Sequence, residues 1–157
     1  MAKVLTMTDF TLIFDDSCLR RSTFGSITAP LYFEFGDYQF PEAGWSDFPV
    51  VILGWWLESY SKFLKGWQDT AEFQFMDGPM LVRLESCQNQ NVRLQCIEQG
   101  KSAELVENTI LISADEITKA IVAASSKLLS ACDERKWHSD DIDNLRMEVN
   151  AMAAISS

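Results

Sequence analysis

Residues 73–96 read FQFMDGPMLVRLESCQNQNVRLQC, and this stretch decides the fold. Apolar and polar side chains alternate in three short runs, which is the period of strands with one buried face. Turn-forming residues at 77–79 and 88–91 separate the runs, and loops this short join antiparallel neighbours. The stretch therefore predicts three consecutive antiparallel strands.

Similar alternation extends the predicted sheet in both directions. Residues 10–14 and 31–35 alternate in the same way, and each run ends at a turn signal. A last strand is expected within residues 104–112. The sheet thus has five or six strands.

The first predicted helix covers residues 47–65. Ser46 or Asp47 can cap its N-terminus, Pro49 suits its first turn, and Gly66 is typical of its end. Its apolar side holds two tryptophans and is wider than that of a simple amphipathic helix. We therefore expect this helix to be deeply packed or to meet a partner.

Two more helices are predicted toward the C-terminus. Ser113 and Glu116 form a capping box before residues 114–135, where apolar side chains recur at helical spacing. Acidic residues after Ser139 suit the start of a helix over residues 140–152. The order β-β-α-β-β-β-β-α-α predicts one α+β domain, residues 1–157, with an antiparallel sheet and three helices largely over one face.

The charge of the chain restricts its partners. It has 13 Lys and Arg against 23 Asp and Glu, a net charge of -10, so nucleic acid and anionic membranes are not expected partners. The charge can steer a basic protein, although it can also serve solubility alone. With no secretory signal and no apolar run of roughly 18 residues, a cytoplasmic protein is expected.

Residues suited to catalysis or cofactor binding are few. His138, the only histidine, lies between two predicted helices and is expected to be an exposed linker residue. The cysteines form no CxxC pair and are expected to be reduced and mostly buried; they are Cys18, Cys87, Cys96 and Cys132. No phosphate-binding glycine loop occurs. We expect no metal, no organic cofactor and no enzyme activity.

Acids and aromatics share the segment between Ser22 and Ser61, which contains no Lys or Arg. Carboxylates steer a basic partner and large aromatics anchor it. The predicted partner-binding residues are Asp37, Tyr38, Glu42, Trp45 and Asp47, with Asp77 nearby.

Two alternative interpretations apply to the same residues. In the structural one, the aromatics seal the sheet to its helix while the acids cap or solubilise that corner. In the enzymatic one, two carboxylates act as a pair in acid-base chemistry, and the candidates are Asp37, Glu42 and Asp77.

Residues 33–48 (FEFGDYQFPEAGWSDF) and 75–79 (FMDGP), together with the element order, resemble small immunity proteins of bacterial polymorphic and contact-dependent growth inhibition toxin systems. The order spans most of the chain, whereas the motifs cover about twenty residues. The resemblance implies a cytoplasmic protein that binds a cognate toxin domain and blocks it by occlusion, without a catalytic residue. A basic nuclease would suit the acidic charge. The alternative function is a non-catalytic protein-interaction or structural adaptor.

Overall fold

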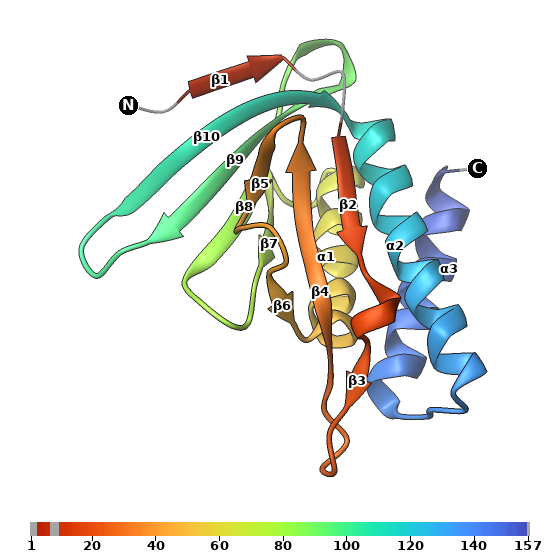
Figure 1. Ribbon diagram of the computed structural model, residues 1–157. Helices are drawn as coiled ribbons and strands as arrows, with labels where there is room; N and C mark the ends of the chain where they lie inside the picture. Colours follow the sequence, from red (N-terminus) through yellow and green to blue (C-terminus); the bar gives the residue numbers. More distant parts are fainter. Residues whose placement is uncertain (1–2, 7–9, 157) are drawn as a thin grey trace.

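The computed structural model describes residues 3–6 and 10–156. It contains two β-sheets and three helices, and Figure 1 shows their arrangement. The α+β class, the antiparallel pairing of the long strands and their order relative to the helices are confirmed.

The first sheet has the order β1-β10-β9-β8-β7. Its strands are β1 (Lys3–Thr6), β7 (Thr70–Gln74), β8 (Met80–Ser86), β9 (Asn91–Gln99) and β10 (Glu104–Ser113). Strands β7 to β10 pair antiparallel with their neighbours in sequence, and residues 73–96 predict this for the first three of them. The edge strand β1 instead runs parallel to β10.

The second sheet is built around β4. Its strands are β2 (Phe10–Phe14), β3 (Arg20–Arg21), β4 (Ile27–Phe35), β5 (Tyr38–Phe40) and β6 (Ser46–Asp47). Strands β2 and β5 pair with the second half of β4, whereas β3 and β6 pair with residues 27–30. The strands are thus divided between two sheets where the sequence predicted one.

The helices are α1 (Pro49–Leu64), α2 (Ala114–Glu134) and α3 (Asp140–Ser156). The side chain of Ser113 caps α2 by accepting the backbone N–H of Glu116 at 3.2 Å, which confirms the predicted N-cap. The cap predicted for α1 is wrong, because Phe48 occupies that position and no side chain caps the helix. None of the helices among the described residues has the length and apolar character needed to span a membrane.

Trp56 of α1 joins the two sheets. Its ring stacks on Phe33 of β4 at 5.4 Å and on Phe73 of β7 at 5.3 Å between centroids, and its Nε1 donates to the carbonyl oxygen of Gln74 at 2.8 Å. Helix α1 also packs against α3, whereas α2 packs on β2. The helices therefore do not share one face of a single sheet.

Candidate functional site

The carboxylate of Asp47, at the end of β6, is the polar centre of the predicted site. Asp47 is only 1% exposed. Its Oδ1 accepts the backbone N–H groups of Phe48 at 2.7 Å and Met76 at 3.3 Å. Its Oδ2 accepts the indole N–H of Trp45 at 3.0 Å and the backbone N–H of Asp77 at 3.1 Å. These four donors compensate the buried charge and fasten the turn after β7 to the start of α1.

The indole of Trp45 covers the same turn. A Cβ atom built on Gly78 would lie 2.9 Å from Cη2 of Trp45, closer than a side chain can approach, and Gly78 has a φ of +155°. The ring also meets Phe75 edge-on, with centroids 6.2 Å apart. Residues 33–48 and 75–79, the two segments that resemble immunity proteins, are therefore in direct contact.

The structure corrects the partner-binding role predicted for Asp47. Pairing of β6 with β4 places Asp47 opposite Ala29, and its carboxylate is buried with four hydrogen bonds. A buried, fully bonded carboxylate cannot steer a partner. The role of Asp47 is therefore structural, as the first of the two alternative interpretations expects. Trp45 packs on Gly78 and is partly buried.

The predicted residues also fall into two separate groups along β4. Tyr38 pairs with Phe35, whereas Asp47 pairs with Ala29. Six residues of strand span about 20 Å, and Figure 1 shows β5 near the tip of the β4 arrow with β6 farther back. Asp37, which precedes Tyr38, is therefore remote from the turn that Asp47 holds.

The hydroxyl group of Tyr38 is hydrogen-bonded within the protein. Its hydroxyl donates to Oε1 of Glu107 in β10 at 3.2 Å, so it links the two sheets. Burial raises the pKa of Tyr38 far above its usual value, and the Glu107 carboxylate acts in the same direction. Tyr38 is therefore a neutral bridge between sheets, with part of its ring still accessible.

Three of the predicted acids, Asp37, Glu42 and Asp77, are exposed. Among the described residues, none of their carboxylates forms a hydrogen bond or an ion pair. They can face a partner. Asp37 and Asp77 lie too far apart along β4 to act as a carboxylate pair, whose groups are usually about 5 to 10 Å apart.

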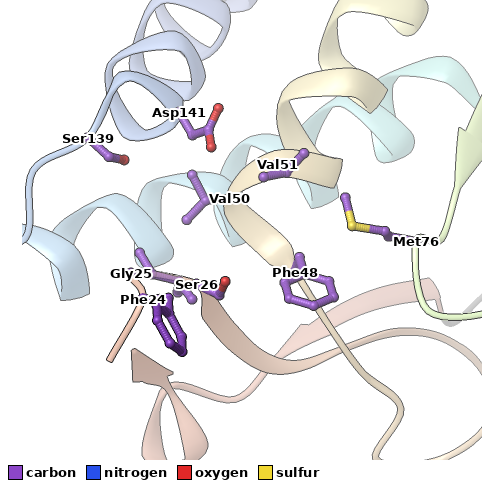
Figure 2. A pocket seen from close by; sticks show the side chains of 10 residues that line it. Phe24, Gly25, Ser26, Phe48, Val50, Val51, Met76, Ser139 and Asp141 are labelled. Carbon is purple, nitrogen blue, oxygen red and sulfur yellow. The ribbon is translucent and has the colours of Figure 1, made fainter. Parts of the chain in front are cut away.

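A pocket of about 370 Å³ opens beside the turn that Asp47 holds. Figure 2 shows Phe24 and Met76 at two sides of it, with Phe48 between them. Its walls come from the β3–β4 loop, the start of α1, the turn after β7 and the start of α3. The apolar residues that line it are Phe24, Ile27, Phe48, Val50, Val51 and Met76. Asp141 is the single charged residue among the described residues that line it.

The sequence predictions did not include these pocket residues. Phe24 is 97% exposed and Met76 is 41% exposed, which is unusual for large apolar side chains. One available signal was Phe24 itself, a bulky apolar residue inside the otherwise polar turn at 22–26, which reads STFGS. Met76 lies within the FMDGP motif but was not predicted to contact a partner.

The described residues contain no cluster of His, Cys, Asp and Glu suited to a metal ion. All four cysteines are free: Cys96 and Cys132 are buried, Cys87 is partly buried and Cys18 is exposed. Burial raises the pKa of the Cys96 thiol, which disfavours the reactive thiolate.

No protein-family model, curated protein or solved structure matches this chain.

Proposed function

We propose that this chain is a cytoplasmic immunity-type protein that binds a basic domain of a cognate toxin and neutralises it by occlusion. The observation that carries the proposal is the exposure of two large apolar side chains, Phe24 and Met76, on ordered turns beside unpaired carboxylates. Occlusion requires a stable contact surface and no catalytic group.

Exposure of Phe24 favours a macromolecular contact. Its side chain is 97% exposed at the tip of the β3–β4 hairpin. Burying a phenylalanine side chain contributes about 2–3 kcal/mol, and aromatics supply much of the energy of protein interfaces. A partner that covers this tip would gain that contribution.

Met76 is presented on a turn that is ordered before any partner arrives. The backbone N–H groups of Met76 and Asp77 both donate to buried Asp47, and Trp45 packs on Gly78 in the same turn. Preorganisation lowers the entropy cost of association. The exposed thioether of Met76 and the carboxylate of Asp77 therefore form a ready apolar and acidic contact.

The charge favours a basic partner. The chain has a net charge of -10, and Asp77 and Asp141 lie exposed at or beside the pocket without an ion pair among the described residues. Opposite charge accelerates association and selects against acidic partners. A nuclease domain with a basic substrate cleft would fit this chemistry.

The proposal expects a toxin domain to be encoded beside this gene, and co-expression with that domain tests it. We expect the two proteins to co-purify and the cells to survive toxin expression. Failure to form a complex, or a complex that leaves the toxin fully active, would overturn it. A stable complex with an active partner would instead support the adaptor function.

Charge steering has its own test, which omits Asp47 because it is buried. In the triple variant Asp37→Asn, Glu42→Gln and Asp77→Asn, association at low salt should slow about tenfold and depend less on salt. The control variant removes the same charge elsewhere through Asp69→Asn, Glu116→Gln and Glu134→Gln, which are also exposed. Equal association rates for the two variants would exclude a local contribution from the first set.

A further inference from the structure

We infer that the pocket between Phe24 and Met76 receives an apolar side chain of the partner that has Lys or Arg beside it in sequence. Phe24 is then buried against the partner's surface. The inference rests on the proposed function, and it specifies the chemistry that the toxin domain must present.

The walls of the pocket are ordered in the free protein. On one side, the backbone N–H of Ser22 donates to the carbonyl oxygen of Ser26 at 2.8 Å, and that of Gly25 donates to Ser22 at 3.0 Å. On the other side, Asp47 holds Met76. The pocket therefore exists before binding, as is usual for sites that accept a side chain or small ligand.

The lining selects an apolar occupant. Six of the ten lining residues are apolar, and the others are Gly25, Ser26, Ser139 and Asp141; a volume of about 370 Å³ accommodates a leucine or phenylalanine side chain with space remaining. An acidic side chain placed against Val50, Val51 and Phe48 would lose hydration and would face the Asp141 carboxylate.

The rim selects a neighbouring cation. The Asp141 carboxylate lines the pocket, is exposed, and has no ion pair or hydrogen bond among the described residues. Asp77 follows Met76 in sequence, and its carboxylate is also exposed and without an ion pair or hydrogen bond among the described residues. A Lys or Arg adjacent to the apolar side chain would meet one of these carboxylates as the interface is desolvated.

The position of Phe24 indicates a protein partner. Phe24 is 97% exposed, so a small molecule that filled the pocket would leave most of its ring in water. A protein surface can cover both the pocket and the ring. A second copy of this chain is disfavoured because each copy has a net charge of -10.

Peptide binding to the full chain tests the inference. The probe is the peptide GKKFKKG, and the matched peptide GEEFEEG has the opposite charge. In ¹⁵N NMR titrations, the first peptide should shift the amide signals of Ser26, Val50 and Val51, whereas the second should not. No shifts at these amides, or equal binding of both peptides, would overturn the inference.

Two tryptophan variants separate pocket filling from nonspecific effects. Ser26→Trp places an indole in the pocket and should weaken GKKFKKG binding at least about tenfold, whereas Thr23→Trp, on the same loop outside the lining, should change it less than about twofold. Asp141→Asn should weaken binding about threefold and reduce its salt dependence. Circular dichroism verifies that each variant folds, and equal binding by the two tryptophan variants would contradict the assignment.

The toxin complex distinguishes this inference from the proposed function. If Ser26→Trp and Phe24→Ala still bind and protect as the unmodified chain does, the pocket assignment is wrong and the immunity function stands. If the unmodified chain forms no complex, the immunity function fails whatever the peptides show. Dimerisation in sedimentation that Ser26→Trp abolishes would overturn the basic partner in favour of a second copy.

Discussion

The indole ring of Trp45 fills the space that a side chain at Gly78 would need, since a Cβ atom there would lie 2.9 Å from Cη2. Gly78→Ala should therefore lower the free energy of unfolding by about 2–4 kcal/mol in urea titrations, from overpacking and backbone strain. Gly36→Ala is the control, because Gly36 has a φ of +61° but nothing within 4 Å of the added Cβ. It should cost only about 1 kcal/mol. Equal losses would show that Trp45 moves away freely.

Replacement of Asp47 by Asn should lower the free energy of unfolding by about 3 kcal/mol. The amide keeps the shape of the carboxylate, but its NH₂ group replaces one acceptor and faces N–H donors. Hydrogen exchange at the Met76 and Asp77 amides should accelerate. Asp77→Asn, the exposed control, should change stability by less than about 0.5 kcal/mol, and a similar loss in both variants would contradict this account.

Tyr60 should make the protein sensitive to alkaline pH. Its hydroxyl donates to the carbonyl oxygen of Ala114 at 2.7 Å, and burial raises the pKa of Tyr60 to about 12. The unfolded chain releases this proton near pH 10, so the stabilisation is complete below that pH. It is lost between roughly pH 10 and 12, at up to about 1.4 kcal/mol per pH unit.

Urea titrations from pH 9.5 to 11.5 check this alkaline dependence. Tyr60→Phe should cost about 1 kcal/mol at neutral pH through the lost hydrogen bond, and its stability should fall less steeply above pH 10. Some slope should persist because the pKa of Tyr38 is raised too. An unchanged slope in a variant that combines Tyr60→Phe with Tyr38→Phe would assign the pH dependence to other groups.

Arg83 connects β8 to two other strands. Its Nη1 and Nη2 donate to both carboxylate oxygens of Glu104 at 2.8 and 2.7 Å, and its Nε donates to Glu72 at 2.8 Å. Arg83→Lys cannot reproduce this paired geometry and should cost about 1 kcal/mol by urea titration. Lys119→Gln removes the exposed pair with Asp115 and should leave the urea midpoint nearly unchanged. Equal costs would mean that the paired geometry adds nothing.

The sequence predicted the elements whose signals are local. Strands β7 to β9 follow from alternation in residues 73–96, and α2 follows from its capping box. Strands β3 and β6 contain two residues each and β5 contains three, too few to show a period. Alternation also does not specify which strands pair, so the division into two sheets was not predictable from it.

The site was predicted only in part, because it also depends on which elements meet in the folded chain. The acidic and aromatic content of the segment is visible in the sequence, but the burial of Asp47 depends on the pairing of β6 with β4. The pocket depends on the β3–β4 loop meeting the starts of two helices. Phe24 stands out in the sequence as an apolar residue in a polar turn, but without a periodic context it does not indicate which elements it lies beside.

Each sheet is assembled mainly from one continuous stretch of chain. Residues 10–47 supply the strands around β4, and residues 70–113 supply β7 to β10, with α1 between them in sequence. Pairing within each stretch closes short loops at low entropic cost, so either sheet can begin to form without the other. Helix α1 completes the core only when Trp56 meets rings from both. Native-state hydrogen exchange should accordingly resolve two cooperative folding units, coupled through α1 and through direct contacts such as that of Tyr38 with Glu107.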